Sequence, residues 1–422
     1  MRITIFASGS RGDVQPMVAL GLGLQAAGHQ VTVAAPSNFA TLVRKHGLSF
    51  HAFAVNVEEL LRSDLGRAWL GHSSHSPGRE VWLVSRLVRE WAGPMAQESL
   101  ALAGTADLFI SGVMTLDVVD ALVTVGGGAH VVALLAPFHA SRSGVVGLRA
   151  PHPARESELN RLAGVATAAA LGFGFGSPGL VARRLLGLAS RRVPSFGRGY
   201  RLSLARTPTV LGASPLVVPP PADWPAWVRS TGYWFLPTPL DWSPEPRLAD
   251  FLASGDAPVY VGFGSMSTRD ADGTLRMIAD GLARAGRRGV IHSGGADLSE
   301  VTTALDSRLL VIDDVPHDWL FPQLAGVIHH GGAGTTAAGL RAGVPSAVVP
   351  HIGDQPYWGR RIAELGVGAD PVPRHRITSE GIAAMIERMS EPAVMSSATQ
   401  LGNRIRAERG VDESVAFIER FG

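Results

Sequence analysis

Residues 327–349 read VIHHGGAGTTAAGLRAGVPSAVV. An apolar run at 327–329 leads into a glycine-rich turn, a helical pattern follows at 335–342, and a second apolar run lies at 347–349. A strand, a helix and a strand joined by short connections predict a parallel β-α-β unit. The glycine-rich turn then lies at the carboxyl end of the first strand, where open parallel sheets bind their ligands.

The same alternation continues on both sides of this unit. In the second half of the chain it predicts further strands at 259–263, 290–292 and 309–312 and helices at 274–285 and 356–365. The first half repeats the pattern, with strands predicted at 2–7, 31–35, 49–53, 108–111 and 130–135 and helices at 17–27, 38–46 and 115–125. We therefore predict an α/β fold with two Rossmann-like domains.

A proline-rich stretch at 216–246 separates the two alternating regions. Proline stiffens a chain and interrupts regular structure, so this stretch predicts an interdomain linker. The predicted domains are then residues 1–215 and 247–400, followed by a helical tail at 401–422. Residues 140–205 break the alternation with glycine, alanine and arginine, which favours an insertion that shapes a binding site.

Length and composition agree with a two-domain globular protein and exclude several classes. The 422 residues exceed the limit of roughly 250–300 residues for a single core. The chain has no cysteine, which excludes a disulfide scaffold, a cysteine zinc site and a cysteine nucleophile. The formal charge is only +2 and Lys45 is the only lysine, so the chain lacks the clustered basic residues expected of a nucleic-acid partner.

Neither the N-terminus nor the most apolar stretch predicts insertion into a membrane. The chain enters its first predicted strand without the basic segment and long apolar segment of a secretory signal, so we expect a cytoplasmic protein. Residues 162–181 carry no charge over about 20 positions, the length of a membrane span. Their five glycines and one proline make them weakly hydrophobic. An apolar wall of a binding cleft, or a surface in peripheral contact with a membrane, is the expectation.

The glycine loops differ from those of two common nucleotide-binding families. No G-x-G-x-x-G motif follows a predicted strand, and no Gly-Lys-Ser/Thr is present, which argues against a nicotinamide dehydrogenase and a P-loop NTPase. Two other glycine loops remain as candidates. The first includes Gly264 and Ser265, directly after the strand at 259–263, and the second is 329–336.

The loop at 329–336 has the chemistry of an anion-binding site. Gly332 and Gly334 allow a close approach of the backbone to a ligand, and the following helix N-terminus presents unpaired N–H groups and a positive dipole end. Thr335 and His330 add side chains that can donate to phosphate oxygens. The alternative is a plain helix cap, which does not account for two adjacent histidines before three glycines.

Two acidic motifs have competing interpretations. Asp354 and Gln355 follow the strand at 347–349 and can bridge sugar hydroxyls, although Asp354 also suits the cap of the next helix. Asp270 and Asp272 form a D-x-D pattern of the kind that binds a metal–nucleotide complex. Acidic residues at a helix start explain that pattern equally well, and we predict no metal site.

The loop between the first strand and the first helix reads GSRGDVQP at 9–16. The Arg-Gly-Asp tripeptide within it is taken as a coincidence, because integrin binding needs an extracellular loop and no export signal is present. Asp13 is presented at the start of the helix, with Ser10 and Arg11 beside it. The same position suits an N-terminal cap, where the helix dipole would lower the pKa of the aspartate.

Three segments together resemble the family 1 glycosyltransferases with the GT-B fold. They are GSRGDVQP at 9–16, VPHDWLFPQ at 315–323, and the block from 329 to 358 that ends in GDQPYW. The C-terminal block is most similar to sterol 3-β-glucosyltransferases, and the N-terminal loop to vancomycin-group and mycobacterial glycolipid glycosyltransferases. The resemblance implies an acceptor-binding N-terminal domain facing a nucleotide-sugar-binding C-terminal domain across a cleft. It also implies that the tail crosses back onto the N-terminal domain.

The resemblance further implies transfer of a sugar from a nucleotide diphosphate sugar to an acceptor hydroxyl, with inversion and without a metal or other cofactor. It assigns donor nucleotide and phosphate contacts to Gly264, Ser265, Val315, His317, Trp319, His330, Gly332, Gly334 and Thr335. It assigns sugar contacts to Asp354 and Gln355. Asp13 occupies the slot of the catalytic base, while Arg11 either faces the leaving diphosphate or braces the loop.

One departure from the family pattern concerns the partner of the base. Relatives with a catalytic histidine orient it with an aspartate from the loop after the fourth strand, but residues 110–113 read Ile-Ser-Gly-Val. Asp117 lies a helical turn further on and is only a remote substitute. An aspartate base needs no partner to fix a tautomer, so this absence is consistent with Asp13 as the base.

The substrates are less sharply predicted than the reaction. The pair Asp354–Gln355 favours glucose from UDP, while a dTDP-deoxysugar transferase of antibiotic biosynthesis is the alternative. The apolar stretch 140–190 and the residues Trp69, Trp82 and Trp91 favour a hydrophobic acceptor such as a sterol or polyketide, unless these tryptophans are core residues. A catalytically silent auxiliary protein is a further alternative, and the sequence does not predict the oligomeric state.

Overall fold

The computed structural model describes residues 1–72, 77–144, 155–188, 196–239, 241–263, 271–294 and 306–422. The chain divides into two compact units. The first comprises residues 1–69, 76–236 and 408–422, and the second consists mainly of residues 237–407. Each unit is an α/β domain built on a parallel sheet, so the predicted fold class is confirmed.

The first unit contains a seven-stranded sheet in the order β3-β2-β1-β4-β5-β6-β7, and every pair of neighbouring strands is parallel. Its strands are β1 (Arg2–Phe6), β2 (Gln30–Pro36), β3 (Ser49–Phe53), β4 (Leu108–Ser111), β5 (Ala129–Leu134), β6 (Thr209–Leu211) and β7 (Val228–Ser230). The helices between them are α1 (Arg11–Ala26), α2 (Ala40–Lys45), α3 (Val57–Arg62), α4 (Asp64–His72), α5 (Pro77–Leu100), α6 (Leu116–Gly126), α7 (Glu158–Phe175), α8 (Ser177–Leu185) and α9 (Phe196–Arg206), with a 3₁₀ turn at Ser37–Phe39.

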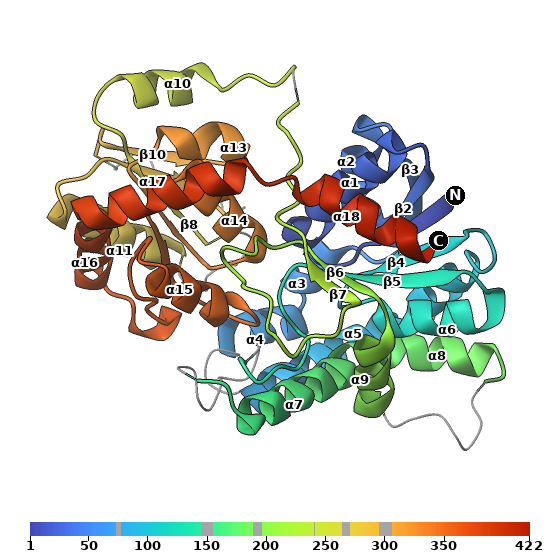
Figure 1. Ribbon diagram of the computed structural model, residues 1–422. Coiled ribbons are helices and arrows are strands. Elements are labelled where there is room, and N and C mark those ends of the chain that lie inside the picture. Colours follow the sequence, from blue (N-terminus) through green and yellow to red (C-terminus); the bar gives the residue numbers. More distant parts are fainter. Residues whose placement is uncertain (73–76, 145–154, 189–195, 240, 264–270, 295–305) are drawn as a thin grey trace. The chain divides into compact units, whose positions relative to one another are not determined.

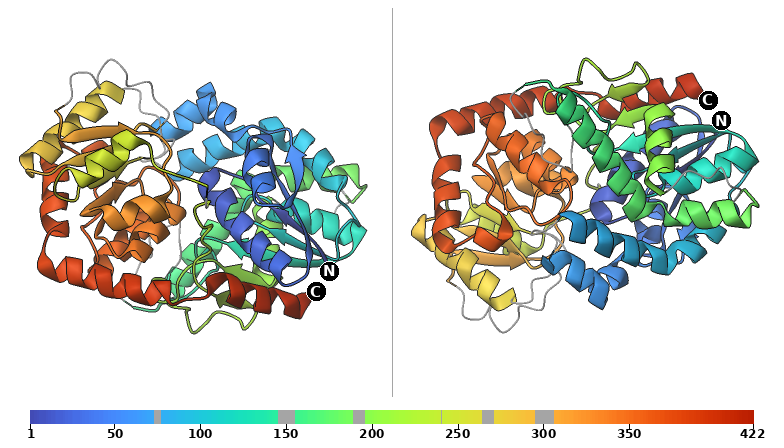
Figure 2. Two further views of the ribbon diagram at one scale, coloured as in Figure 1. Left: turned by 90° about the horizontal axis from the view of Figure 1, so that it is seen from above. Right: turned by 90° about the horizontal axis from the view of Figure 1, so that it is seen from below.

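Alternate strand residues supply two apolar cores, one on each face of this sheet. Ile3 and Ile5 point toward α1 on one face, while Phe6 and Phe109 belong to the core that includes α5 and α6 on the other. Burial of both faces explains why the strands are almost continuously apolar. The helices α7, α8 and α9, green in Figures 1 and 2, lie with α5 on the second face.

The second unit contains a five-stranded parallel sheet in the order β10-β9-β8-β11-β12. Its strands are β8 (Val259–Gly262), β9 (Gly289–His292), β10 (Leu309–Ile312), β11 (Gly326–His329) and β12 (Ser346–Val348). Its helices are α10 (Pro246–Ala253), α11 (Ala271–Arg284), α13 (His317–Leu320), α14 (Ala333–Ala342), α15 (Gln355–Glu364), α16 (Ser379–Met389) and α17 (Pro392–Arg406), with 3₁₀ turns at Phe321–Gln323 and Arg374–Arg376.

The proline-rich stretch differs from the predicted linker in where it begins. Residues up to 236 belong to the first unit, because β7 pairs with β6 and Trp234 is buried in the core beside α1. A three-residue strand at the sheet edge tolerates the surrounding prolines, which concealed it in the sequence. Residues 237–245 connect this unit to α10.

The tail also begins later than predicted. Helix α17 runs to Arg406 within the second unit, and residues 408–422 belong to the first. There α18 (Gly410–Ile418), followed by a 3₁₀ turn at Glu419–Phe421, packs on α1, as Figure 1 shows. The fit is close, because a Cβ added at Gly23 of α1 would lie 2.2 Å from Cγ1 of Val411. The boundary at 401 therefore falls inside α17.

The uncharged stretch at 162–181 forms most of α7 and the start of α8. Across the described residues, no single helix combines the length and hydropathy needed to cross a bilayer, although α7 and α8 meet both conditions as a pair bent by 61°. Leu162 and Phe173 of this pair are 57% and 40% exposed.

Candidate functional site

The glycine-rich turn at the carboxyl end of β11 is shaped for close contacts. Gly331 has a φ of +90°, and a Cβ there would lie 2.6 Å from Cγ1 of Val348. Gly332 precedes α14 with no side chain capping the helix, so the N–H groups of the first turn, including those of Gly334 and Thr335, have no intrahelical acceptor. Four amide donors and the positive end of the helix dipole are therefore available to an anion.

Histidines line this end of the sheet and are neutral at pH 7. Burial lowers the pKa of His330 to about 4. A hydrogen bond with the backbone of Gly262 favours the charged ring and partly opposes this shift. Burial also lowers the pKa of His351 to about 3 and that of His329 well below its ordinary value. His329, His330 and His351 influence one another electrostatically, so the ends of β11 and β12 bring them together.

Several buried polar atoms at these loops have no hydrogen-bond partner among the described residues: Nε2 of His329, Nδ1 of His330, Oγ1 of Thr336 and Nε2 of His351. The Nδ1 atom of His329 accepts from the backbone N–H of Gly331 at 3.0 Å, so the neutral ring carries its proton on Nε2. Nδ1 of His351 contacts the carbonyl of Val349 at 2.8 Å, which leaves Nε2 as an acceptor. Buried polar groups are normally paired, so this concentration makes the end of the sheet a candidate binding site.

Asp354 and Gln355 lie side by side at the start of α15, but both already hold the loop. Oδ2 of Asp354 accepts from Nε1 of Trp358 at 2.7 Å. Oε1 of Gln355 accepts from the backbone N–H groups of His351 and Ile352 at 2.7 and 3.0 Å. The side-chain carbonyl of Gln355 thus fixes the loop that carries His351.

The segment expected to hold the nucleotide base is packed by aromatic rings. His317 stacks on Phe321 with ring centroids 4.3 Å apart, and Trp319 packs against Trp242 at 5.1 Å. Val315 joins the same apolar cluster. Asp318 between them accepts from the backbone N–H of Thr238 at 2.9 Å. These contacts hold the turn that lies in the chain between β10 and β11.

Three residues of interest lie outside the described residues: Gly264, Ser265 and Asp270. Asp272, the second acid of the D-x-D pattern, lies in the first turn of α11 and is exposed. Among the described residues no group of three or more histidine, aspartate and glutamate side chains is placed to hold a metal ion.

In the first unit, the loop after β1 presents Asp13 in the first turn of α1. Oδ2 of Asp13 accepts from the backbone N–H and the hydroxyl of Ser10 at 2.8 and 2.9 Å. Burial raises the pKa of Asp13, and the two hydrogen bonds from Ser10 act in the opposite direction. Arg11 is exposed and donates from Nε to Oε1 of Gln15 at 3.2 Å.

Gly9 makes this geometry possible. Its φ is +124°, and a Cβ at this position would lie 2.4 Å from Oδ2 of Asp13 and 2.7 Å from Cε of Met114. Any other residue would therefore displace the carboxylate. The oxygen that accepts from Ser10 at the start of α1 is thus held by a turn that only glycine fits.

Asp117 belongs to a different cluster from Asp13. Burial raises its pKa to about 7, with Arg183 lowering it and Asp120 raising it. Helix α8 presses on it, because a Cβ at Gly179 would lie 2.6 Å from Cβ of Asp117. Asp117 also raises the pKa of Tyr200, whose hydroxyl donates to the carbonyl of Val113 at 2.6 Å.

Sequence reasoning found the loops but assigned no role to His329 or His351. The signal for the two histidines is their position at, or within three residues of, the end of a strand. Of the three tryptophans considered for an acceptor surface, Trp91 packs against the apolar core beside α5 and Trp82 is 48% exposed. Trp69 is partly buried.

Two family models match the chain, one in each half. Residues 3–136 match the glycosyltransferase family 28 N-terminal domain. Residues 280–419 match the C-terminal domain of proteins like the erythromycin biosynthesis protein CIII.

Curated relatives align along the whole chain. Sterol 3-beta-glucosyltransferase UGT80B1 of Arabidopsis thaliana is 32% identical over 100% of this chain and 68% of its own length. O-mycaminosyltylonolide 6-deoxyallosyltransferase of Streptomyces fradiae is 32% identical over 100% of this chain and 97% of its own length. The sterol 3-beta-glucosyltransferase of Aspergillus oryzae is also 32% identical, and the chain spans 30% of its length.

Solved structures share the fold. The glycosyltransferase VinC in complex with dTDP has a TM-score of 0.65 and 20% identity, covering 100% of this chain and 99% of its own. SsfS6 of Streptomyces sp. SF2575, complexed with thymidine diphosphate, has a TM-score of 0.63 and 21% identity over 100% and 99%. The two parallel-sheet units are those of the GT-B architecture, and with relatives of this identity along its whole length the chain belongs to the GT-B-fold glycosyltransferases.

Proposed function

We propose that the protein transfers a hexose from a nucleotide diphosphate sugar, UDP-glucose in the first instance, to a hydroxyl of a hydrophobic acceptor such as a sterol or polyketide. The reaction inverts the anomeric carbon, needs no metal ion, and takes place in the cytoplasm. The observation that carries the proposal is the uncapped N-terminus of α14 surrounded by buried, unpartnered histidine and threonine atoms.

The donor diphosphate is assigned to the first turn of α14. The amides of this turn and the hydroxyl of Thr335 would bind phosphate oxygens, and His330 would be the nearest group able to gain a positive charge. These groups stabilise the leaving diphosphate as a metal ion would, through fixed dipoles in a dry site. EDTA is accordingly expected to leave activity intact, and strong loss restored by Mg²⁺ would overturn this assignment.

Asp13 is assigned as the general base. The acceptor oxygen forms a bond to the anomeric carbon while the bond from that carbon to the diphosphate oxygen breaks. The electron pair leaves with the diphosphate, and the acceptor proton passes to Oδ1 of Asp13. The raised pKa of Asp13 makes the carboxylate a stronger base than a solvated aspartate.

Substitution of Asp13 tests this role. Asp13→Asn keeps a side-chain oxygen for Ser10 and is expected to lower kcat by roughly 10²–10⁴-fold, because base catalysis is lost. Donor affinity, measured by calorimetry with UDP-glucose, should stay within about twofold. Turnover of Asp13→Asn close to that of the wild type would refute the assignment.

A dTDP-deoxysugar donor is the second candidate, and one observation favours it. Asp354 and the carbonyl of Gln355 are engaged within their own loop, which leaves fewer groups to bind sugar hydroxyls than a glucose donor would use. The Streptomyces fradiae relative is named as a deoxyallosyltransferase. We would compare kcat/KM for UDP-glucose, dTDP-glucose and a dTDP-deoxyglucose. The first pair measures the preference for the nucleotide base, and the second pair measures the preference for the sugar.

A catalytically silent auxiliary protein is the remaining alternative. Transfer to any acceptor, or slow hydrolysis of the donor, would exclude it. A screen of donors against sterol and polyketide acceptors with mass spectrometry would detect both. Absence of transfer and hydrolysis with every donor that binds would favour the auxiliary role.

A further inference from the structure

A cavity lies within the first unit, formed by elements other than the Asp13 loop. Its volume is about 460 Å³, and it lies among the loop after β5, helices α7 and α9, and the connection between β6 and β7. Val165, Ala168 and Leu204 supply an apolar lining. A cavity of this volume falls within the range of sites for small molecules.

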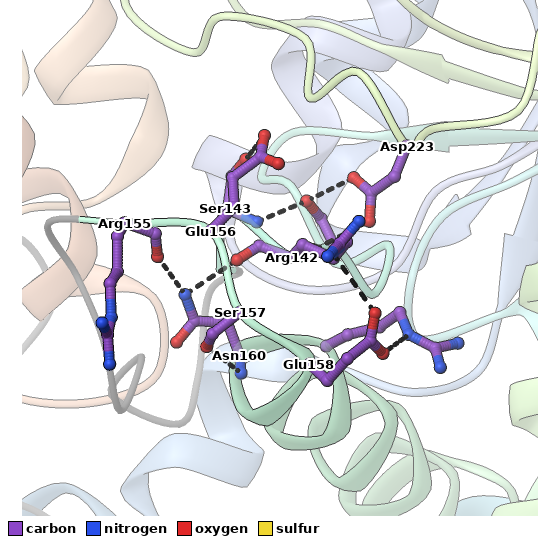
Figure 3. Close-up of polar contacts among 10 residues, drawn as sticks. Arg142, Ser143, Arg155, Glu156, Ser157, Glu158, Asn160 and Asp223 are labelled. Carbon is purple, nitrogen blue, oxygen red and sulfur yellow. Dashed lines mark hydrogen bonds and ion pairs between the residues drawn. The ribbon is translucent and has the colours of Figure 1, made fainter.

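Two carboxylates at this cavity already have partners. Glu158 lies between two arginines, with Oε1 3.2 Å from Nε of Arg142 and Oε2 2.7 Å from Nε of Arg161. Asp223 accepts from the hydroxyl of Ser141 and the backbone N–H of Arg142, both at 2.8 Å. Figure 3 shows Arg142 between the two acids. Each carboxylate is thus satisfied before any ligand arrives.

Arg201 supplies the remaining charge. It lines the same cavity from α9 and, over the part of the chain that is described, makes no hydrogen bond or ion pair. The cavity therefore holds three guanidinium groups against two carboxylates, a surplus of one positive charge. His139 adds none at neutral pH, because burial lowers its pKa to about 4.

The wall that carries Arg142 is fixed by Asn160, which is fully buried in α7. Its Nδ2 donates to the carbonyls of Arg142 and Arg155 at 2.8 and 3.0 Å, and the N–H of Ser157 donates to the carbonyl of Arg142 at 2.9 Å (Figure 3). These bonds fix the backbone at Arg142 and Arg155 against the start of α7. The cavity is therefore preformed, which lowers the entropic cost of binding.

We propose that this cavity binds a small amphipathic monoanion, a carboxylate with an apolar chain. The guanidinium of Arg201 receives the carboxylate, since its paired donors match the two oxygens. The chain lies over Val165, Ala168 and Leu204. One unpaired cation beside an apolar lining favours a single negative charge over a diphosphate, so this ligand differs from the donor. The inference is independent of the proposed glycosyl transfer.

Titration calorimetry of the full chain with octanoate tests the proposal. We expect one octanoate to bind per chain. Acetate lacks the apolar chain and 1-octanol lacks the carboxylate, so each should bind at least about tenfold more weakly than octanoate. Arg201→Gln should weaken octanoate binding by about tenfold or more. Arg206→Gln removes an exposed arginine at the end of the same helix and should leave the affinity unchanged.

Circular dichroism and thermal unfolding establish that each variant is folded. If Arg201→Gln does not fold, Ala168→Leu provides the second test, because it fills the apolar lining and keeps every charge. Its octanoate affinity should fall by a similar factor. Equal affinity in the wild type and in either folded variant, or acetate and inorganic phosphate binding as tightly as octanoate, would overturn the proposal.

Discussion

His330 is the residue whose charge the proposed donor changes most. Its pKa is lowered to about 4 by burial, so the ring is neutral at pH 7 in the free protein. A diphosphate at the N-terminus of α14 would favour the imidazolium and raise this pKa. A group whose pKa rises on binding takes up a proton, so affinity increases as pH falls toward the pKa of the free ring.

The expected result is tighter binding of UDP-glucose at pH 6 than at pH 8, by up to about tenfold for each pH unit below the pKa of the complex. UDP-glucose is the suitable probe because both ends of its diphosphate are esterified and keep their charge over this range. His330→Gln should bind more weakly and lose the pH dependence. A pH dependence that persists unchanged in His330→Gln would contradict the assignment.

Gly9 and Gly12 offer a matched pair in the Asp13 loop. Gly9→Ala would place a Cβ 2.4 Å from Oδ2 of Asp13 at a φ of +124°, whereas a Cβ at Gly12 meets nothing closer than 3.6 Å. Gly9→Ala is expected to cost about 1–3 kcal/mol of unfolding free energy and to reduce kcat. Gly12→Ala, within α1, should be neutral or stabilising. Denaturant unfolding and steady-state kinetics provide both measurements, and equal effects of the two changes would contradict this view of Gly9.

The sequence could predict which loop residues lie at the candidate site, because these loops directly follow strands. It could not predict the direction of their side chains. Asp13 was expected to be a cap as well as a base, and its hydrogen bonds from Ser10 confirm the cap. Gln355 was expected to face a sugar, yet its carbonyl turns to the backbone of His351 and Ile352. That choice depends on loop geometry that sequence spacing does not contain. The catalytic and binding roles remain predictions.

At the scale of elements, most strands and the helices directly between them were predicted within a few residues, but the longest helices, α5 and α7, were not. The strands β1 to β5 and β8 to β12 are examples of the predicted elements, and the glycine-rich turn does precede a helix. Strand β6 and the edge strand β7 were missed because three residues carry too little pattern, and prolines surround them. Helix α18 could be placed on α1 only from tertiary contacts, such as the hydroxyl of Ser414, which accepts from Nε1 of Trp234 at 2.7 Å.

The packing of α8 on α6 makes the stability of the first unit dependent on pH. Burial raises the pKa of Asp117 to about 7, above the value of about 3.9 expected in the unfolded chain. The folded state therefore binds more protons between these values, and the contribution of Asp117 to stability falls as pH rises from about 4 to 7. At about 1.4 kcal/mol for each pKa unit, the whole change is about 4 kcal/mol.

Asp117→Asn should flatten this part of the pH–stability profile and make the protein more stable than the wild type at pH 8. Chemical denaturation at several pH values measures the profile. Glu90→Gln, which changes an exposed carboxyl on α5, is the control and should leave the slope unchanged. A wild-type profile that rises between pH 4 and 7, with the same slope in Asp117→Asn, would be the contrary result.

For the whole molecule, two units with separate cores imply that ligands act locally. A donor bound at the N-terminus of α14 stabilises only conformations in which the loops after β11 and β12 are folded. The carboxylate proposed for the first unit instead involves α7 and α9. The two ligands should therefore protect different parts of the chain.

Hydrogen exchange measured by mass spectrometry tests this division. UDP-glucose at about 100 times its Kd should stabilise the second unit by about 2.7 kcal/mol, which slows exchange of β11 and α14 by up to about 100-fold. Peptides from β2 and β3 should exchange as they do without ligand. Octanoate should produce the reverse pattern, with protection in α7 and α9 and none in α14. Uniform protection of both units by either ligand would show that their stabilities are coupled and would reject this independent behaviour.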